Sequence, residues 1–489
     1  MIRRRYLGAL AALCLVAAAC SGGSADPATT LAATTTPATT TTKAATTTTT
    51  SLPPGVDLIL RGGPIVTMAD PPLAEAVAVT GDSIVAVGTE AEVMALAGSA
   101  TSVVDLGGRA LYPGFIDAHS HWYVWGGAWV GLHGAPEVTQ ALFARGWTGT
   151  TEMALDPYWW DGVVAAAEVG EMGARVDGYM ALNAPQGEEK YLEWFRGLGL
   201  TPGTMIGDHL RIVGVKLYVD EAWGSIDKYS QEELDAVVAE MHSAGWQIAA
   251  HVVDDDTMDQ MLHALEAAIA ADPRPHRHRI EHAVEVRDDQ LERLVALGIT
   301  ASVQLGGIEA EFPFDPPFWE MIADTGLETV WRWRDMIEAG ITLVGSVDVP
   351  PPGFVLGPTS KSPMRMVYGA VTGWSESGAE PWEGREAQLL TIEEAIRSLT
   401  ATAAWITSDE GVRGSIQPGL LADLVVFSAD PLGFGEDPEG LLGITTAATL
   451  LGGRLVWCGD GEEALCEGFG QPMPVRVLDE STLVPSPPG

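Results

Sequence analysis

Short segments in which apolar and polar residues alternate occupy both ends of the chain. Near the start they read VDLILRGGPIVTM, EAVAVTGDSIVAVG and TSVVDLGGRALYPG, and near the end GSIQPGLLADLVVFSADP and ATLLGGRLVWCGD. Alternation with a period of two is typical of strands with one buried face, and the Gly pairs that interrupt it indicate turns. We therefore expect residues 53–112 and 409–489 to form one small β-sandwich domain built from both ends of the chain.

The middle of the chain, residues 113–408, alternates apolar strand patterns with helical patterns such as SQEELDAVVAEMHSAG and DDTMDQMLHALEAAIAA. Eight strands over about 240 residues fit an α/β fold of the (β/α)8 TIM-barrel type. A doubly wound open sheet is the alternative, but no Gly-rich phosphate loop follows the first strand. The eight expected strands read LYPGFIDAH, GWTGTTEMA, ARVDGYMAL, LRIVGVKLYV, WQIAAHV, HRIEHA, GITASVQ and ITLVGSVD.

The first 52 residues differ in composition from the rest. Residues 1–20, MIRRRYLGALAALCLVAAAC, hold three arginines, an apolar run and small residues before Cys20, which is the architecture of a secretory signal peptide. Alanines before a cysteine resemble a lipoprotein lipobox, so we expect Cys20 to be lipidated. The protein would then be exported and held at the outer face of the cytoplasmic membrane. An uncleaved anchor and ordinary cleavage nearby are the alternatives. Residues 21–52, rich in Thr, Ala and Pro, predict a disordered tether.

Charge and cysteine content narrow the range of partners. The formal net charge of −39 argues against a nucleic-acid partner and against electrostatic docking on an anionic membrane, so the lipid would be the only membrane anchor. With Cys14 in the leader and Cys20 lipidated, Cys458 and Cys466 remain. Two cysteines this close in an exported protein are compatible with a disulfide and equally with two unpaired buried thiols.

One lysine stands in an unexpected place. The chain has only five lysines, and Lys216 lies inside the apolar, β-branched run RIVGVKLYVD. Burying an ammonium group is costly unless the group is paired, neutralised or chemically changed. An unmodified lysine paired with Asp220 or Glu221 is one explanation for its position.

The expected barrel strands end in ionisable or polar side chains. Catalytic groups of such barrels lie at the C-terminal ends of the strands, so these side chains should meet. His119 and His121 are two residues apart and would face the same side of the first strand. Glu152 and Gln304 end the second and seventh strands and are expected to line the pocket. The ionisable set comprises His119, His121, Lys216, His251, His282 and Asp348.

These residues carry a resemblance to a known family. PGFIDAHSH, the lysine strand, the strand ending on His251, RIEHA and a late D-x-P resemble the amidohydrolase superfamily, and its YtcJ-like branch with the N-substituted formamide deformylases in particular. The resemblance spans about Val56 to Asp460. It differs at GSVDVP, where one extra residue separates Ser346 from Asp348. The resemblance implies that His119, His121, His251 and His282 are metal ligands, that Lys216 is a bridging ligand, and that Asp348 is both ligand and proton shuttle.

The same resemblance implies a cofactor and a reaction. Two divalent ions, expected to be zinc, would be bridged by an N-carboxylated Lys216 and would supply a metal-bound hydroxide. That hydroxide would cleave a non-peptide C–N bond of a small molecule, such as an N-substituted formamide, an N-acyl amine or a cyclic amide. A single-metal hydrolase or deaminase of the same superfamily and a non-catalytic binding lipoprotein are the alternatives. A homo-oligomer is compatible with the sequence.

Other residues are weaker candidates. We expect His242 and His263, which lie on helical patterns, at the surface or in a groove. Clusters of tryptophan fall where strand-to-helix loops belong and would wall a pocket for an apolar or ring-bearing substrate, with loop packing as the alternative. The tryptophans expected in this wall are Trp122, Trp125, Trp159 and Trp160.

Overall fold

A computed structural model provides the structure of the chain. It describes residues 55–124, 132, 134–184, 190–220, 228–306, 326–349, 361–374 and 381–470. The expected leader with Cys20, the tether and Trp125 lie outside the described residues. Within these ranges, no helix is both long enough and apolar enough to cross a membrane.

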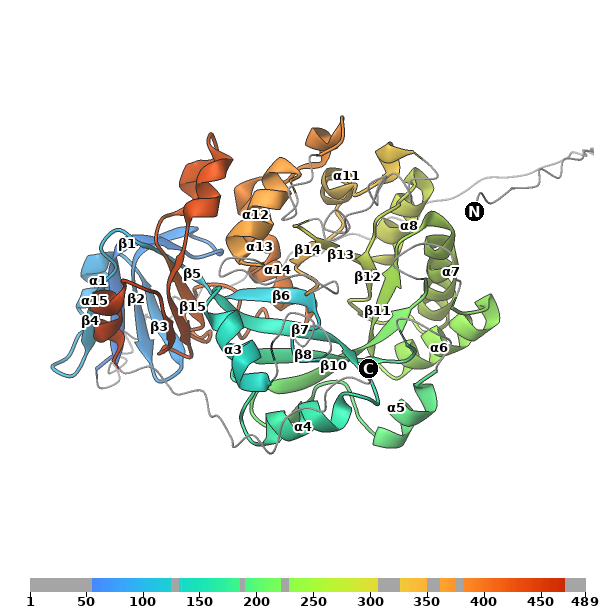
Figure 1. The fold of residues 1–489 in the computed structure, drawn as a ribbon, viewed down its shortest axis with the longest axis horizontal. Coiled ribbons are helices and arrows are strands. Elements are labelled where there is room, and N and C mark those ends of the chain that lie inside the picture. Colours follow the sequence, from blue (N-terminus) through green and yellow to red (C-terminus); the bar gives the residue numbers. More distant parts are fainter. Residues whose placement is uncertain are drawn as a thin grey trace, which may run out of the picture. The chain divides into compact units, whose positions relative to one another are not determined.

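Strands from both ends of the chain form one sheet, as the alternating patterns predicted. In Figure 1 the blue N-terminal and red C-terminal strands lie in this sheet. Its order is β17-β16-β15-β5-β1-β2-β3, and β4 pairs with β1. Most neighbours are antiparallel, and β1 runs parallel to β4 and β5. The strands are β1 (Leu58–Val66), β2 (Leu73–Thr80), β3 (Ser83–Gly88), β4 (Ser102–Asp105), β5 (Ala110–Pro113), β15 (Leu424–Phe427), β16 (Thr446–Leu451) and β17 (Arg454–Cys458).

A Gly pair and a disulfide shape this sheet. The register of β1 against β2 shifts between Arg61 and Ile65, where Gly62 has a φ of 81°. This left-handed conformation favours glycine, so the pair that interrupts the alternation marks a bulge. Cys458 at the end of β17 forms a disulfide with Cys466, which is one of the two states that the sequence left open.

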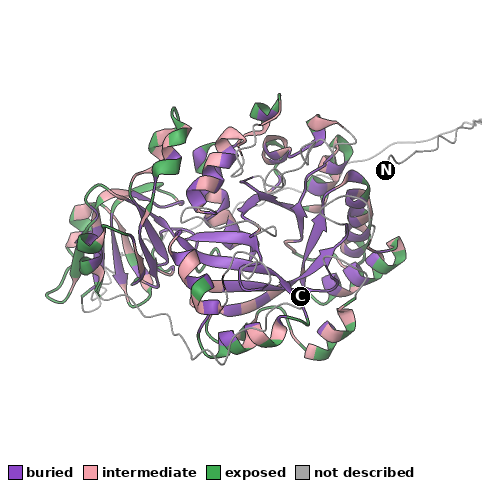
Figure 2. Cartoon of the chain, viewed as in Figure 1, coloured by how far each residue is buried: buried purple, intermediate pink, exposed green. Residues whose placement is uncertain are grey.

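A second sheet contains all eight strands expected for the barrel. Its order is β14-β13-β12-β11-β10-β8-β7-β6, every neighbouring pair is parallel, and the short β9 (Thr204–Ile206) pairs antiparallel with β10. Figure 2 shows these strands as almost continuously buried, which explains their unbroken apolar runs. The strands are β6 (Phe115–Ser120), β7 (Trp147–Leu155), β8 (Arg175–Ala181), β10 (Leu210–Tyr218), β11 (Gln247–Val252), β12 (Arg279–His282), β13 (Thr300–Gln304) and β14 (Leu343–Ser346).

Hydrogen bonds just beyond β14 bring the two ends of this sheet together. The backbone N–H of Asp348 donates to the carbonyl oxygen of His119 over 2.8 Å. The N–H of Val347 donates to Asp117 Oδ1 over 2.9 Å, and that of Val349 donates to Ser120 Oγ over 3.2 Å. The barrel is therefore nearly closed, and the fold class expected from the sequence is confirmed.

Helices follow the barrel strands along the chain, and several begin with a side-chain cap. Ser230 and Glu233 form a capping box at α6, and Asp254 accepts a hydrogen bond from the N–H of Thr257 at α7. The helices of the barrel region are α3 (Ala135–Phe143), α4 (Trp160–Glu168), α5 (Leu192–Leu198), α6 (Gln231–Ser243), α7 (Asp255–Ala271), α8 (Asp288–Leu297), α11 (Trp333–Glu338), α12 (Pro363–Thr372), α13 (Ile392–Ser398) and α14 (Ala401–Ile406). The small sheet carries α1 (Glu90–Met94) and α15 (Glu463–Cys466).

The small sheet joins the barrel through β5, which leads directly into β6. Gly114 lies between these strands, and its N–H donates to the carbonyl oxygen of Asp423 over 2.8 Å. A Cβ atom at Gly114 would lie 2.1 Å from Thr148 Oγ1, so a side chain would not fit there. Phe427 of β15 packs against Phe115 of β6, with ring centroids 5.5 Å apart. The first barrel strand is thus anchored to the C-terminal part of the sheet.

Candidate metal centre

The residues that the sequence places at strand ends converge at the C-terminal end of the barrel. His119 lies in β6 and His121 directly follows it, Lys216 lies near the end of β10, and His251 and His282 lie near the ends of β11 and β12. Asp348 follows β14 by two residues. The four histidines and Lys216 are all buried.

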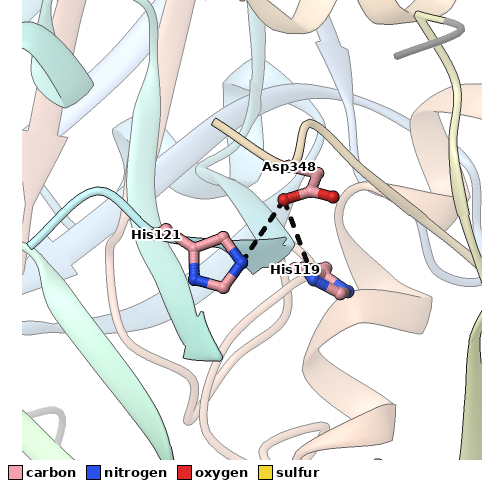
Figure 3. Close-up of side chains that lie close together, drawn as sticks. All are labelled: His119, His121 and Asp348. Carbon is pink, nitrogen blue, oxygen red and sulfur yellow. Dashed lines mark ion pairs between the residues drawn. The ribbon is translucent and has the colours of Figure 1, made fainter. Parts of the chain in front are cut away.

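His119, His121 and Asp348 form the tightest group, with one ligand atom of each within 4.8 Å of the others. Figure 3 shows one oxygen of Asp348 facing both rings. Asp348 Oδ1 lies 3.5 Å from His121 Nε2 and 3.8 Å from His119 Nε2. Two atoms bound to one zinc ion at about 2.1 Å in tetrahedral geometry are about 3.4 Å apart. The three donors therefore fit a shared divalent ion.

The backbone at Asp348 is strained and directs the carboxylate toward the histidines. Asp348 has a φ of 51°, and His282 has a φ of 73°. Non-glycine residues adopt this left-handed region at a cost, and such residues concentrate at functional sites. Val347, the extra residue that separates Asp348 from Ser346, is buried. The insertion therefore leaves the Asp348 carboxylate within the site.

A buried ion pair orients His119. Glu281 Oε2 accepts a hydrogen bond from His119 Nδ1 over 2.6 Å. Arg279 Nη2 donates to the same oxygen over 2.9 Å and to the carbonyl oxygen of Ala118 over 2.8 Å. A carboxylate partner keeps the ring proton on Nδ1, which leaves Nε2 of His119 free of a proton and pointing toward Asp348.

His282 has a hydrogen-bonded partner like that of His119, whereas His251 only lies near a carboxylate. Gln304 Oε1 lies 2.9 Å from His282 Nδ1, so this amide oxygen accepts a hydrogen bond from the ring N–H. His282 Nε2 is buried and has no hydrogen-bond partner among the described residues. Asp220 Oδ1 lies 3.5 Å from His251 Nε2. The rings of His251 and His282 are 4.2 Å apart between centroids. These two histidines form a second pair of donors beside the first group.

Burial sets the protonation of the site. It lowers the pKa of all four histidines below the usual value, and the positive charge of Lys216 adds to this effect. Neutral imidazole is the form that binds metal ions. Burial also lowers the pKa of Lys216 to about 8 and raises the pKa of Asp348 to about 7. Lys216 Nζ lies 3.4 Å from His119 Nε2.

Two residues expected to line the pocket instead support the histidines. Gln304 holds His282, as described, and its amide nitrogen donates to Ser346 Oγ over 3.1 Å. Glu152 is fully buried, accepts a hydrogen bond from the N–H of Tyr123 over 2.8 Å and lies 3.6 Å from His121 Nδ1. The positions of Glu152 in β7 and Gln304 in β13 predict that both side chains face the inside of the barrel. They do not predict that these side chains contact the histidines rather than a substrate.

The tryptophans do not form the expected wall as a set. Trp122 is fully buried and its indole N–H donates to Asp117 Oδ2 over 3.0 Å, so it ties the end of β6 to the core rather than facing a substrate. Trp160 in α4 packs edge-on against Trp194 in α5, with centroids 6.1 Å apart. Trp159 is buried at the start of α4. For Trp122 and Trp160, loop and helix packing is the better interpretation.

His242 lines a pocket, so the groove alternative holds for it, and His263 is exposed as predicted. His242 is buried, and its Nδ1 lies 2.8 Å from His278 Nε2. The N–H of Ile248 donates to His278 Nδ1, so the proton of His278 is on Nε2 and points to His242. His242 Nε2 in turn donates to the carbonyl oxygen of Asp272. Each ring nitrogen of this pair already has a partner, so the pair is structural.

Four residues of the site were missed in the sequence: Asn183, Tyr218, Asp220 as a partner of His251, and Glu281. Tyr218 lies two residues after Lys216 on β10, so the period of two was an available signal for it. Glu281 directly precedes His282 in β12 and therefore alternates out of step with it, which gave no such signal. Asn183 hydrogen-bonds to the backbone of Tyr218 from the neighbouring strand, and this contact also left no signal in the sequence.

Comparison with known proteins decides the family. A profile of the amidohydrolase family matches residues 144–457, well over half of the chain. This protein belongs to the amidohydrolase family. Lys216, His251, His282 and Asp348 of the amidohydrolase lie within the matched segment, and the first histidine pair precedes it.

Individual relatives agree with this assignment. The amidohydrolase is 26% identical over 239 residues to YtcJ of Bacillus subtilis (strain 168), itself described as an amidohydrolase, with 49% of this chain and 42% of YtcJ covered. It is 27% identical over 240 residues to N-substituted formamide deformylase of Arthrobacter pascens, with 46% and 42% covered. The matched region thus spans less than half of each curated relative. The YtcJ-like branch expected from the sequence is confirmed.

A solved structure supports the fold. An uncharacterized metal-dependent hydrolase from Pyrococcus horikoshii OT3 superposes with a TM-score of 0.64 at 19% identity, over 78% of this chain and 99% of that chain. At that identity the likeness concerns the fold alone. This amidohydrolase thus combines the fold of a metal-dependent hydrolase with a donor set able to bind a metal ion.

Proposed function

We propose that this amidohydrolase cleaves a non-peptide C–N bond of a small molecule. The substrate would be an N-substituted formamide, an N-acyl amine or a cyclic amide. The single observation that carries the proposal is the convergence of His119, His121 and Asp348, whose ligand atoms lie within 4.8 Å of one another. A relative named N-substituted formamide deformylase supports a C–N bond as the target.

The donor set suits two zinc ions. His119, His121 and Asp348 would hold one ion, and His251 and His282 would hold the other, because imidazole and carboxylate are preferred zinc ligands. Lys216 Nζ lies 3.4 Å from His119 Nε2, and its charge also lowers the pKa of His251 and His282. As an N-carboxylated lysine it would carry two oxygens on a long arm and could bridge both ions. A plain pairing of Lys216 with Asp220 is less favoured, because Val253 N and Thr257 Oγ1 donate to Asp220 Oδ2 and Oδ1 has no hydrogen-bond partner among the described residues. Glu221 lies outside the described residues.

Each residue then has a defined task. Bound zinc lowers the pKa of a water molecule and polarises a substrate carbonyl group. Asp348 would accept a proton from the attacking water and return it to the leaving nitrogen. Glu281 and Gln304 keep the protons of His119 and His282 away from the donor atoms, so that these atoms stay available.

Two other functions are weaker. A single-metal hydrolase or deaminase would not need the second pair of donors, His251 and His282, whose rings lie 4.2 Å apart. A binding lipoprotein without turnover would not need a carboxylate held in a strained conformation beside two histidines, as Asp348 is.

Metal content tests the proposal. Protein purified with zinc should hold about two ions per chain, as expected for a bridged site. It should hydrolyse at least one member of a panel of formamides, N-acyl amines and cyclic amides. Chelation should abolish turnover and lower the melting temperature, because ions that bind only the folded state stabilise it. Elemental analysis, a substrate screen and thermal melts provide the measurements.

The matched control is His263→Gln, since His263 is exposed on α7. It should keep the metal content of the wild type. A single ion per chain would support the single-metal alternative, and zinc-loaded protein that turns over nothing in the panel would contradict the proposed reaction.

We further propose that the protein is exported and anchored by lipid at Cys20. The arginines, the apolar run and the alanines before Cys20 support this location. The disulfide between Cys458 and Cys466 also suits an oxidising compartment. Cys20→Ala should lose incorporation of labelled palmitate in cells that lipidate the wild type, and equal labelling would contradict the anchor.

A further inference from the structure

Tyr218 carries a buried hydroxyl group that has no hydrogen-bond partner in the part of the chain that the structure describes. The residue is the last of β10 and is only 5% exposed, and its Oη is buried. Most buried polar side-chain atoms in proteins are hydrogen-bonded, so an unpaired hydroxyl calls for an explanation. Leaving such a group unpaired is unfavourable, and a bound ligand that accepts its hydrogen bond would remove that cost.

The phenol lies among the proposed metal ligands. Tyr218 and Lys216 are two residues apart on one strand, so both side chains point to the same side. Lys216 Nζ lies 5.0 Å from the centre of the phenol ring. On the neighbouring strand Tyr218 pairs in register with His251, and the two rings are 5.7 Å apart between centroids.

The backbone of Tyr218 is fixed from the neighbouring strand. Asn183, which follows β8 and is buried, accepts a hydrogen bond from the N–H of Tyr218 over 3.0 Å. Its amide nitrogen donates to the carbonyl oxygen of Tyr218 over 2.9 Å. Both backbone polar groups of Tyr218 are therefore held by one side chain, which fixes the point of the strand from which the phenol projects.

The charges of Asp348, Asp156 and Glu152 act on the phenol of Tyr218. None of these carboxylates accepts its proton, since Oη lacks a hydrogen-bond partner. The hydroxyl is thus an unused donor beside the residues that would hold the ions.

We propose that Tyr218 Oη donates a hydrogen bond to the substrate oxygen that becomes negative when water adds to the carbonyl carbon. This inference deepens the proposed function and rests on it. Water forms the new C–O bond, the C–N bond breaks, and the proton passes through Asp348 to the leaving nitrogen. Tyr218 keeps its own proton throughout and stabilises charge only. A hydroxyl donor at this place favours substrates with an acyl carbonyl, such as formamides and amides.

Tyr218→Phe tests the inference because it removes only the hydroxyl. We expect kcat to fall about 100-fold with little change in KM, as for loss of one donor to a developing oxyanion. Zinc content and melting temperature should stay at wild-type values. Inorganic phosphate, a tetrahedral oxyanion, should bind the zinc-loaded variant at least about tenfold more weakly by calorimetry, since one charge-assisted hydrogen bond is lost.

Tyr112→Phe is the matched control. Tyr112 is also buried, but its hydroxyl donates to Asp430 over 2.6 Å, at the junction with the small sheet. Its turnover and phosphate affinity should match the wild type.

Each outcome separates the two proposals. Unchanged kcat and unchanged phosphate affinity in Tyr218→Phe would overturn the donor role, and so would a loss of zinc, which would make the phenol a ligand. If the wild type hydrolyses nothing in the panel, the phosphate affinity of the two proteins still tests whether Tyr218 donates a hydrogen bond. Weaker binding by the variant would support the donor while the proposed reaction fails.

Discussion

Asp348→Asn should fold and bind metal but lose turnover by about 10³-fold or more, within the range expected when a general acid–base is removed. The asparagine side chain keeps the shape of aspartate and one oxygen that can face His119 and His121. Its amide cannot take a proton from water or deliver one to the leaving nitrogen. We therefore expect kcat to fall while the zinc content stays close to that of the wild type. Steady-state kinetics and elemental analysis measure these two quantities.

Asp235→Asn is a suitable control. Asp235 lies on α6 and its carboxylate is 3.8 Å from the exposed His263, away from the strand ends. This variant should keep full turnover. Activity of Asp348→Asn within tenfold of the wild type would remove the proton-shuttle role, and an apo protein would show that Asp348 acts chiefly as a ligand.

Lys216→Ala should have the second large effect, a loss of about 10³-fold that short carboxylates partly restore. Lys216 is fully buried, so truncation opens a cavity beside His119. If the wild type carries an N-carboxylated lysine, formate or acetate can enter that cavity and supply the missing oxygens, as zinc prefers. Turnover should rise with added acetate and saturate, and zinc content should rise with it.

Lys190→Ala controls for unspecific effects of the added carboxylate. Lys190 lies outside the barrel strands, with its ammonium over the ring of Tyr229. Acetate should not change its turnover. Full activity of Lys216→Ala without acetate would show that the lysine is no ligand, and a complete loss that no carboxylate rescues would favour an unmodified lysine.

Much of the barrel could be predicted because its strands are buried on both faces. Runs such as those around Val215 and Ile248 therefore read as continuous apolar segments with helical patterns between them. Strand ends could then be located within one or two residues. The ligand candidates followed because parallel strands end at one edge, where His119, Lys216 and Asp348 meet.

The supporting contacts could not be predicted, because they depend on register between strands and on side-chain direction. Glu281 reaches His119 from β12, and Gln304 reaches His282 from β13. Neither pair is close in sequence. The expectation that Trp122 walls the pocket failed for the same reason. Its indole N–H donates to the buried carboxylate of Asp117, and this contact sets the direction of the ring.

His242 shows another limit of periodicity. Its place on the helical pattern of α6 was correct, yet the ring turns inward because His278 and Asp272 satisfy both of its nitrogens. A polar residue on a helix reads as exposed unless its partners are known. The left-handed backbone of Asp348 is likewise a property of the closed barrel and of no local pattern.

The anchoring of β6 has a consequence for how the chain acquires its structure. Pro113 of β5 pairs with Leu424 of β15, and the hydroxyl of Tyr112 bonds to Asp430, 318 positions later. Contacts between such distant segments form late, because a long loop must close first. Until β15 has emerged, β5 presents an unpaired edge just ahead of His119. We therefore expect β6, which carries His119, to be anchored only after β15 has been synthesised. A chain that ends before β15 should be degraded by cellular proteases faster than the full chain.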